Sequence, residues 1–517
     1  MNRLTTSVVI VGGGSAGWIT AGTLAARFRA EFKRDVSVTL VESPNVPIVG
    51  VGEGTWPTMR KTLMKMGIRE TDFIRECNVS FKQGAKFAKW ATGEEDDYYY
   101  HPLMLPQGYM EENLVPHWLE NNGGMSFSKA VCPQEVLCEN GLAPKLITTP
   151  EYAGIANYAY HLDAGAFSEF LKNHCTQELG VRHVLDDVTG VNSAENGDIS
   201  SVQTKESGDI SGELFIDCTG FKSLLLGEHF NVPFKSCKDV LFLDTALAIQ
   251  VPYQDEDSPI ASHTISTAQD AGWIWDIGLP TRRGVGHVYS SAHTTQEIAE
   301  EKLRDYLSAS VKDVAELEFR KIPINPGHRE KFWEKNCVAI GLAAGFLEPL
   351  EASALLLVEI SANFIAEQFP VNRSAMSVIS KRFNETFLYR WDRIIDFLKL
   401  HYVASSRTDS AFWIDNRDPR SIPDSLQELL VLWENQSPWH DDFDRALEVF
   451  PAASYQYVLY GMGFKTDDLG MGVSDPRREF AYSQFSRNLN MSEDLKQKLP
   501  KNRDLIRKIN KYGLQKV

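Results

Sequence analysis

The chain has 517 residues, of which 43% are hydrophobic, 24% charged and 11% aromatic. This composition fits a packed globular protein of about three domain-sized units and excludes a largely disordered one. Asp and Glu outnumber Lys and Arg by 69 to 53, for a formal net charge of −16 at pH 7. A field of this sign repels phosphate backbones and anionic lipid, so nucleic acid and membrane surfaces are poor candidate partners.

The seven cysteines are scattered along the chain and show none of the spacings of a metal site. An odd, scattered set of this kind is typical of reduced thiols in a cytoplasmic protein. The apolar run at the start is short and leads directly into glycines, so no signal peptide is expected. No run of about 20 apolar residues predicts a membrane span.

The first predicted elements form a βαβ unit. Ser7–Val11 and Val36–Val41 are β-branched runs typical of buried strands, and residues 18–28 between them predict a helix. The backbone of the glycine turn and the start of the helix would bind a pyrophosphate, while Glu42 would accept hydrogen bonds from a ribose. A turn that only packs the helix on the strand is the alternative. The turn residues are Gly12, Gly13, Gly14, Ser15, Ala16 and Gly17.

A further strand, Glu213–Asp217, runs into Cys218, Thr219 and Gly220. An apolar strand that ends in Asp-x-x-Gly far downstream of a βαβ unit is typical of FAD proteins in which insertions split the nucleotide-binding domain. NAD dehydrogenases usually complete this domain in one stretch. By analogy, the order of these elements therefore favours FAD over NAD.

The later elements change from strands to helices. Residues 237–295 predict several strands, whereas Glu297–Ala309, Leu355–Gln368 and Arg382–Tyr402 predict helices. The last third of the chain is therefore expected to be mostly α-helical, with most of its aromatic side chains in the core. The clearest of the strands are Leu241–Val251, Ile274–Leu279 and Val285–Ser290.

Packing alone does not account for the residue pattern of four further patches. They are Gly50–Pro57 (GVGEGTWP), Asn78–Trp90 (NVSFKQGAKFAKW), Gly272–Pro280 (GWIWDIGLP) and Gly341–Ala354 (GLAAGFLEPLEASA). Together with the glycine turn and the run Tyr100–Pro102, they occur in the order found in flavin-dependent halogenases. Over roughly residues 5–415 the sequence resembles this family, which the tryptophan halogenases typify.

The resemblance implies an α/β fold with a Rossmann-like, GxGxxG FAD-binding domain of the flavin monooxygenase type, an inserted β-sheet region and a mostly α-helical C-terminal substrate region. The FAD-binding core would be discontinuous, at residues 1–90 and 150–355, with the β-rich insert at about 237–295. Residues 91–149 and 356–517 would form the substrate-binding, mostly helical region.

The resemblance also implies FADH2- and O2-dependent halogenation of an electron-rich, indole-like aromatic. In the family, a flavin C4a-hydroperoxide oxidises chloride or bromide, and the hypohalous acid passes through a tunnel to a lysine. By position in SFK that lysine is Lys82, which would hydrogen-bond the acid or form a haloamine. Lys86 and Lys89 follow at helical spacing, so a solvated charged face is the alternative. A separate reductase would supply FADH2, because no second nucleotide fingerprint is visible.

The resemblance makes Glu351 the catalytic partner, which would stabilise the positively charged ring intermediate; a helix-start acid is the structural alternative. The backbone N–H groups of Ser353 and Ala354 would bind the halide. The family often has Ser-Thr-Gly where this chain has Ala352-Ser353-Ala354, which leaves the preference between chloride and bromide open. Trp273 and Trp275 would form a tunnel wall between flavin and substrate, with simple core packing as the alternative.

The remaining implied contacts concern flavin and substrate. His101 and Leu103 take the positions of an indole sandwich whose second member is usually Phe, and a structural role for His101 is an equal alternative. The lid that clamps free tryptophan in the family is not found in residues 440–465, where Glu448 and Tyr455–Tyr457 are the nearest candidates. The further FAD contacts are Val49, Val51, Gly54, Leu342 and Leu355.

Two other functions stay open from the sequence: a flavin monooxygenase that acts directly on its substrate, and a non-catalytic flavin-binding paralogue. Lys82 and the tryptophan pair argue against the first, and Lys82 with Glu351 argues against the second. The substrate, the position of halogenation and the oligomeric state are not determined, and a homodimer is one possibility.

Overall fold

The computed structural model describes residues 4–31, 35–46, 52–121, 123–445, 448–467 and 474–516. The chain divides into two compact units, each assembled from three stretches of sequence. Unit 1 comprises Met1–Val79, Leu162–Cys237 and Asn325–Trp391, and unit 2 comprises Ser80–His161, Lys238–Ile324 and Asp392–Val517.

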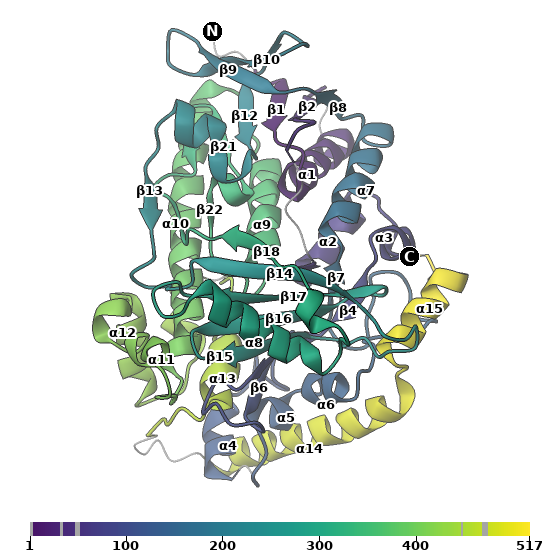
Figure 1. Ribbon diagram of the computed structural model, residues 1–517, viewed down its shortest axis with the longest axis vertical. Coiled ribbons are helices and arrows are strands. Elements are labelled where there is room, and N and C mark those ends of the chain that lie inside the picture. Colours follow the sequence, from purple (N-terminus) through teal and green to yellow (C-terminus); the bar gives the residue numbers. More distant parts are fainter. Residues whose placement is uncertain are drawn as a thin grey trace. The chain divides into compact units, whose positions relative to one another are not determined.

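Unit 1 contains a mostly parallel six-stranded sheet in the order β20-β21-β12-β1-β2-β8 (Figure 1). At its centre β1 (Ser7–Val11) runs parallel to β2 (Ser37–Glu42) and β12 (Leu214–Asp217). The strands come from distant parts of the sequence, as expected for an FAD-binding domain that is split by insertions. The outer strands are β8 (Arg182–Leu185), β20 (Trp333–Glu334) and β21 (Cys337–Ala339).

The helices of unit 1 pack through small residues. α1 (Ser15–Glu31) lies against α7 (Ala164–Gln177) and α9 (Ser353–Glu367), and buries the glycines and alanines that allow helices to approach closely. Shorter elements are β3 (Glu53–Gly54), α2 (Thr58–Lys65) and α3 (Glu70–Glu76).

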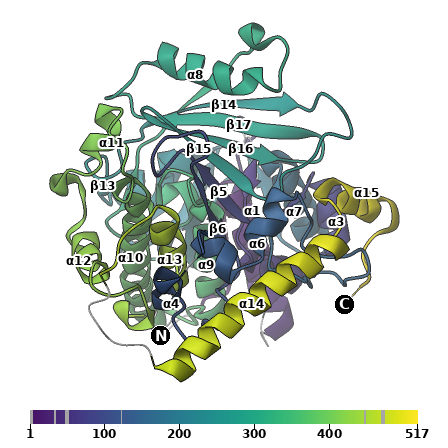
Figure 2. The same cartoon turned by 90° about the horizontal axis from the view of Figure 1, so that it is seen from below.

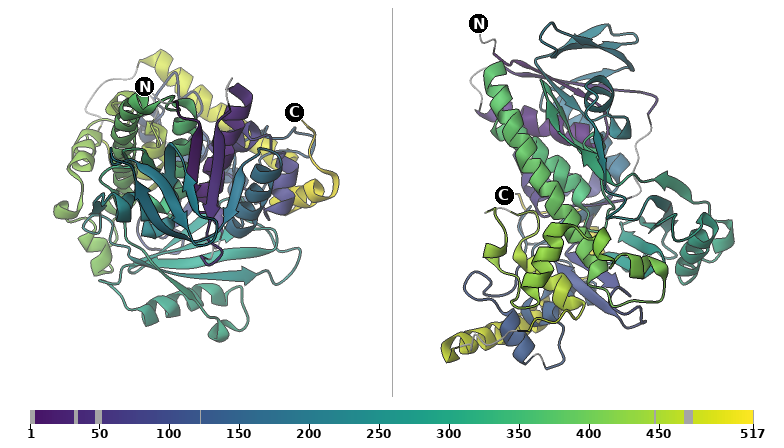
Figure 3. Two further views of the ribbon diagram at one scale, coloured as in Figure 1. Left: turned by 90° about the horizontal axis from the view of Figure 1, so that it is seen from above. Right: turned by 90° about the vertical axis from the view of Figure 1, so that its left-hand side faces the viewer.

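Two small antiparallel sheets complete unit 1. One consists of β9 (Val188–Ser193), β10 (Ile199–Thr204) and β11 (Asp209–Ser211), and is visible in Figure 3. The other consists of β13 (Phe234–Ser236), β19 (Gly327–Arg329) and β22 (Gly345–Phe346).

Unit 2 contains a seven-stranded sheet in the order β18-β14-β17-β16-β15-β5-β6. Its neighbouring strands are antiparallel except for β15 and β5. α8 (Gln296–Ser308) covers one face (Figure 2), where Leu303 and Leu307 join the core. The strands are β5 (Gly84–Ala88), β6 (Tyr98–Pro102), β14 (Thr245–Pro252), β15 (Thr264–Gln269), β16 (Gly272–Gly278), β17 (Arg282–Tyr289) and β18 (Arg320–Pro323).

The rest of unit 2 is mostly helical. β4 (Ser80–Lys82) pairs with residues 159–161 of β7 (Ala159–Leu162). The long helix α10 (Arg373–Val403) has residues in both units. The helices of unit 2 are α4 (Val115–Glu120), α5 (Phe127–Val131), α6 (Gln134–Glu139), α11 (Ala411–Asp415), α12 (Asp424–Trp433), α13 (Ala452–Gly461), α14 (Asp475–Lys498) and α15 (Asn502–Tyr512).

The predicted α/β class, the early βαβ unit, the strands of residues 237–295 and the helical last third are confirmed. The helical spacing suggested for Lys86 and Lys89 is wrong, because Lys86 lies on strand β5 and Lys89 in the turn that follows it. In the described ranges, no helix is both long and apolar enough to cross a membrane.

Candidate functional site

The nucleotide turn requires glycine at two positions for lack of space. Gly12 has a φ of 116°, and a Cβ there would lie 2.2 Å from the carbonyl oxygen of Cys218. A Cβ at Gly17 would lie 1.9 Å from the carbonyl oxygen of Gly12. Since the obstacles are backbone atoms, only glycine lets β1, the turn and α1 pack at these distances.

Gly14 differs, because a Cβ there would have no atom of the described residues within 4 Å. The turn is therefore open on this side, next to the start of α1 at Ser15, whose hydroxyl lies 2.9 Å from that of Ser168. Helix N-termini carry free N–H groups and a partial positive charge. The open side of the turn and the helix start together fit the pyrophosphate of FAD.

Glu42 lies at the end of β2, as the sequence predicts for a ribose-binding acid. A Cβ at Gly13 would lie 2.2 Å from its Cδ, so the carboxylate lies directly over the turn. Its Oε2 is 2.8 Å from Nε2 of His183, and both side chains are about one-fifth exposed. The carboxylate is thus held beside the turn and still reaches solvent, which fits a ribose contact.

Asp217, the acid of the Asp-x-x-Gly pattern, is fully buried. Its carboxylate accepts hydrogen bonds from the backbone N–H groups of Thr219, Leu225 and Leu226 at 3.1, 2.8 and 2.8 Å. These bonds fix the chain that leaves β12. The acid of this pattern therefore has a structural role.

The remaining predicted flavin contacts are placed only in part. The 3-10 helix Gly341–Ala343 approaches the turn, because a Cβ at Gly341 would lie 2.8 Å from Cβ of Ala16. Leu342 on this helix is half-buried, while Leu355 on α9 and Gly54 on β3 are buried. Val49 and Val51 lie outside the described residues.

The predicted halide site is the start of α9. The helix begins at Ser353 after its N-cap residue Ala352, which has left-handed angles (φ 53°, ψ 38°) and makes no side-chain capping bond. Such an N-terminus presents free N–H groups, so Ser353 and Ala354 fit an anion site. Left-handed angles cost alanine roughly 1 kcal/mol relative to glycine, a strain that is often found at functional sites.

Glu351 lies in the turn directly before this helix and not in its first turn, so an interaction with the helix N-terminus stays the structural alternative. Its side chain is buried, with 5% exposed. Its peptide oxygen accepts a hydrogen bond of 2.9 Å from the indole Nε1 of Trp56, which belongs to the GVGEGTWP patch. Two patches that are distant in sequence are thereby held together in unit 1.

Glu359, in the second turn of α9, also joins two elements of unit 1. Its carboxyl accepts hydrogen bonds from the hydroxyls of Thr62 at 2.7 Å and Thr58 at 3.3 Å, both on α2. Burial raises the pKa of Glu359 to about 8, although the two hydroxyls lower it. The acid is therefore mostly protonated at neutral pH.

Lys82 is buried, with 4% exposed, at the end of β4 in unit 2. It is paired in register with Ala159 on β7, and the small side chain opposite leaves room for the lysine stem. Two residues earlier, the Ser80 hydroxyl donates to the peptide oxygen of Gly278, at the end of the GWIWDIG strand. The SFK and GWxW patches are therefore linked.

His161, which sequence reasoning missed, lies beside Lys82. Register places His161 opposite Ser80, and therefore on the same face of the β4–β7 pair as Lys82. The imidazole is fully buried, and its Nε2 shares a 2.8 Å hydrogen bond with the Thr264 hydroxyl. Burial first, and the charge of Lys82 next, hold the pKa of His161 well below its ordinary value.

Trp273 and Trp275 are both buried on β16, with ring centroids 6.4 Å apart. The Trp275 ring lies over Gly286 of β17, where a Cβ would be 2.2 Å from it. The Trp273 ring also contacts Trp90, at a centroid distance of 6.5 Å. The pair thus belongs to a rigid aromatic layer, which fits either a tunnel wall or core packing.

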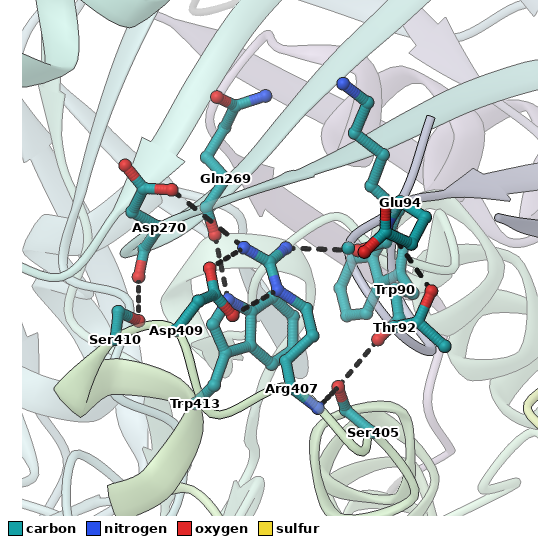
Figure 4. A network of polar contacts seen from close by, with 12 residues as sticks. Trp90, Thr92, Glu94, Gln269, Asp270, Ser405, Arg407, Asp409, Ser410 and Trp413 are labelled. Atoms are coloured by element: carbon teal, nitrogen blue, oxygen red, sulfur yellow. Dashed lines mark hydrogen bonds and ion pairs between the residues drawn. The ribbon is translucent and has the colours of Figure 1, made fainter. Parts of the chain in front are cut away.

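The buried Arg407 side chain contacts segments next to this aromatic layer (Figure 4). Arg407, 6% exposed, forms a fork with the carboxylate of Asp409 at 2.9 and 2.6 Å and donates to the peptide oxygen of Lys89 at 3.0 Å. It also lies over the Trp413 ring, whose Nε1 donates to the peptide oxygen of Gln269, just before β16. These contacts hold the segment that follows β5 and the end of β15, the strand that pairs with β16.

His101 is buried on β6, with its Nε2 2.9 Å from the hydroxyl of Ser454 on α13. Its ring lies 5.6 Å from that of Phe397 and 6.4 Å from that of Phe450. Leu103, half-buried, follows β6 and donates its N–H to Gln134. The imidazole is therefore a fixed member of an aromatic cluster.

Ser454, Phe397 and Phe450 escaped sequence reasoning, because they lie about 300 residues or more from His101 in the sequence. The lid candidates Tyr455 and Tyr457 are buried on α13: Tyr455 packs on Phe397, and the Tyr457 hydroxyl donates to the peptide oxygen of Met104. In this structure they are core residues.

All seven cysteines are free and buried. Burial raises the pKa of the Cys132 and Cys175 thiols to about 12, which keeps them protonated. In the part of the chain that the structure describes, no cluster of three or more His, Cys, Asp or Glu side chains could hold a metal ion.

The predicted residues fall into two groups. The nucleotide turn, Glu42, Gly54, Leu342, Glu351 and the start of α9 belong to unit 1, and Lys82, the tryptophan pair, His101 and Leu103 belong to unit 2. Within unit 1 the structure brings Ala16 next to Gly341, and within unit 2 it brings Lys82 next to His161.

Comparison with known proteins gives long matches. The tryptophan halogenase family profile matches residues 7–474. Tryptophan 6-halogenase SttH of Streptomyces toxytricini is 35% identical over 477 residues, which cover 88% of this chain and 89% of that protein. The structure of a tryptophan halogenase from Shewanella frigidimarina NCIMB 400 has 52% identity and a TM-score of 0.97, and covers 100% of this chain and 99% of the other.

A further solved structure is that of Tar14, a tryptophan C-6 flavin-dependent halogenase (chlorinase) from taromycin biosynthesis. It is 34% identical with a TM-score of 0.90, and the match covers 98% of this chain and 99% of that one. The family match extends beyond residue 415, where the predicted resemblance ended. The chain therefore belongs to the tryptophan halogenase family, enzymes that halogenate with a halide, O2 and FADH2 from a separate reductase.

Proposed function

We propose that this enzyme halogenates an indole-bearing substrate, with Lys82 and Glu351 as its catalytic residues. Bound reduced FAD supplies, with O2 and a halide, the hypohalous acid that the reaction uses. The Lys82 amine receives this oxidant, either by hydrogen bonding or as a haloamine, and presents the electrophilic halogen to the aromatic ring. Glu351 stabilises the positive charge that develops on the ring.

The burial of Lys82 carries this proposal. Lys82 is 4% exposed, whereas the side chains of the nearby lysines Lys86 and Lys89 are 22% and 31% exposed. Desolvation of a lysine has a free-energy cost and lowers the pKa of its ammonium group, which favours a nucleophilic amine. A lysine that served only solubility would have no reason to be buried.

The flavin and halide contacts follow the same proposal. The nucleotide turn and Glu42 would hold the pyrophosphate and ribose of FAD, with further contacts from Gly54, Leu342 and Leu355. The N–H groups of Ser353 and Ala354 would hold the halide. The open side of Gly14 and the uncapped start of α9 support these two assignments. Trp273 and Trp275 would separate flavin from substrate.

The substrate class is inferred from the relatives and from His101. SttH is a tryptophan 6-halogenase and Tar14 a tryptophan C-6 chlorinase, so tryptophan and related indoles, with chloride as the first halide, are the first compounds to test. The hydrogen bond to Ser454 fixes the imidazole plane, which suits stacking on a flat aromatic ring. His101 and Leu103 are the proposed substrate contacts.

Three broader assignments complete the proposal. Residues 91–149 and 356–517 would supply the substrate-binding region, and residues 1–90 and 150–355 the FAD-binding core. The enzyme would act in the cytoplasm, where buried thiols stay reduced. It would form a homodimer, which light scattering would detect as twice the 58.1 kDa of the chain.

The test combines the purified protein with a flavin reductase, NADH, FAD, O2, bromide or chloride, and a panel of indoles that includes tryptophan. A product with the mass and isotope pattern of one added halogen is expected from the wild type. Lys82→Met keeps the buried apolar stem and removes the amine, so it should form no product. Lys89→Met, at a partly exposed lysine seven residues further along, is the matched control and should keep full activity.

Each other outcome points to a different function. A product with one added oxygen would indicate a monooxygenase, and tight FAD binding without any product would indicate a non-catalytic flavoprotein. A Lys82→Met enzyme that still halogenates would overturn the assignment of Lys82.

A further inference from the structure

His161 and Lys82 form a buried pair with one unused nitrogen. Both lie on the same face of the β4–β7 pair, at diagonal positions that long side chains can bridge. His161 Nε2 is bonded to Thr264, while its Nδ1 is buried and has no hydrogen-bond partner among the residues that the structure describes. An unsatisfied buried nitrogen is costly, which points to a function for it.

The chemistry proposed for Lys82 requires a proton acceptor. An ammonium group has no lone pair, so its nitrogen cannot bond to halogen until one proton has left. Water is largely excluded at a side chain that is 4% exposed. The acceptor is therefore expected among the neighbouring protein groups, and a neutral imidazole is a base that can take this proton.

We propose that His161 is the proton acceptor of Lys82, taking a proton at Nδ1 when the lysine nitrogen is halogenated and returning it when the halogen is transferred. This inference rests on the proposed function. It requires the tautomer in which Nε2–H donates to Thr264, because Nδ1 then carries the lone pair.

The steps balance as follows. Lys82–NH3⁺ gives a proton to His161, leaving Lys82–NH2 and an imidazolium. The amine nitrogen attacks the halogen of HOX, so the N–X bond forms and the O–X bond breaks, and hydroxide leaves with an amine proton as water. The aromatic ring then takes X⁺ from the nitrogen and loses its own proton to it. The regenerated amine regains the proton held by His161.

The charge of the pair explains why the proton can be shared. While Lys82 is an ammonium, its charge opposes a second positive charge on His161, and the ring stays neutral. Once the nitrogen carries halogen and is uncharged, this repulsion is gone and the imidazole binds the proton more readily. The pair therefore holds one positive charge throughout. The other titratable group that acts on His161 is His263, which is also buried.

The first test is the pH profile of His161→Gln, which keeps an N–H group for Thr264 but has no titratable nitrogen. The rate constant of single-turnover bromination should fall by about 10²-fold near neutral pH. The KM for the substrate, from steady-state kinetics, should change little. Because hydroxide must then remove the proton, the rate should rise roughly tenfold per pH unit. His287→Gln, at another buried histidine of unit 2, should have the same pH profile as the wild type.

The second test needs neither flavin nor turnover. In protein labelled with ¹³C at histidine Cε1, the His161 signal, identified by its loss in His161→Gln, should titrate at a higher pH in Lys82→Met than in the wild type. The same midpoint in both proteins would overturn the inference, because the two groups would then not share charge.

The outcomes separate this inference from the proposed function. The wild-type enzyme could make halogenated product while the pH profile of His161→Gln runs parallel to the wild-type profile. The proposed role of Lys82 would then be kept, and His161 would have only a structural role. If the wild type makes no such product, the proposed function fails, whatever the titration of His161 shows.

Discussion

In the part of the chain that the structure describes, a β-carbon at Gly14 would meet no atom within 4 Å, whereas one at Gly17 would lie 1.9 Å from a backbone oxygen. The two glycines of one motif therefore have different roles. Gly17 is required by the packing of the polypeptide itself, and Gly14 leaves a space that the polypeptide does not fill. This difference can be measured separately as fold stability and as cofactor affinity.

Gly14→Ala should fold normally but bind FAD poorly, because its methyl group would occupy the space assigned to the pyrophosphate. We expect the melting temperature of the FAD-free protein to be unchanged, and the Kd for FAD to rise about tenfold or more, which is about 1.4 kcal/mol. Gly17→Ala is the contrast: overpacking should cost about 1–3 kcal/mol or more in stability. Differential scanning fluorimetry and flavin-fluorescence titration measure the two effects, and unchanged FAD affinity in Gly14→Ala would contradict the assignment.

The sequence predicts those site residues whose role follows from a local sequence pattern. The glycine turn and SFK are read directly from neighbouring residues. His161 carries no such pattern, since its relation to Lys82 arises only from the register of β4 with β7. Ser454 reaches His101 across 353 positions, and no spacing rule links them.

At the scale of elements, Glu359 joins α9 to α2 through two threonine hydroxyls and is protonated at neutral pH. Its pKa is raised from 4.5 to about 8 in the folded protein. The folded state therefore binds more protons than the unfolded state between these values, and stability falls as pH rises through this window. The stabilising contribution of the Glu359 side chain is fully present below the pKa of the unfolded state, and it is lost as the pH rises through the pKa of the folded state.

Glu359→Gln should remove this pH dependence, because the amide stays neutral and its oxygen still accepts from Thr62. Each pKa unit corresponds to about 1.4 kcal/mol, so the variant should be more stable than the wild type by on the order of a few kcal/mol at about pH 9, with little difference near pH 5. Melting temperatures across this range measure the effect. Glu367→Gln, at an exposed position of the same helix, is the control, and a Glu359→Gln curve parallel to the wild type would refute the argument.

Arg407 offers a test of how loops hold the tryptophan strand. Arg407→Met should lower the stability by about 2 kcal/mol, because the Asp409 carboxylate and the peptide oxygen of Lys89 lose a buried guanidinium donor and the Trp413 contact is lost. Arg420 forms the same kind of fork with an aspartate two residues away, but is 90% exposed. Arg420→Met should therefore leave the melting temperature unchanged. Equal effects of the two substitutions would show that burial of the Arg407 fork does not matter.

For the whole molecule, the sequence predicts which elements form better than it predicts how those elements pair. Buried β-branched runs and amphipathic helices are local signals, so most elements could be predicted. Lys86 shows the limit: spacing alone suggested a helix, but pairing of β5 with β15 and β6 makes the segment a strand. The pairing of β5 with β15 joins residues that lie far apart in the sequence, such as Ala85 and Thr264, and a single sequence does not display such contacts.

The burial of all seven thiols is a property of the whole fold and suits the chemistry. Thiolates react rapidly with hypohalous acid, so an enzyme that generates this oxidant is protected when its thiols are buried and their pKa values are raised.

Native protein should therefore release almost no thionitrobenzoate from Ellman's reagent within minutes, while protein in concentrated guanidinium chloride should show all seven thiols. Ser308→Cys, at an exposed position at the end of α8, should add a single reactive thiol and validates the assay. Fast reaction of a native cysteine would mean that a thiol is accessible, and that the fold protects its oxidisable groups less well than its burial indicates.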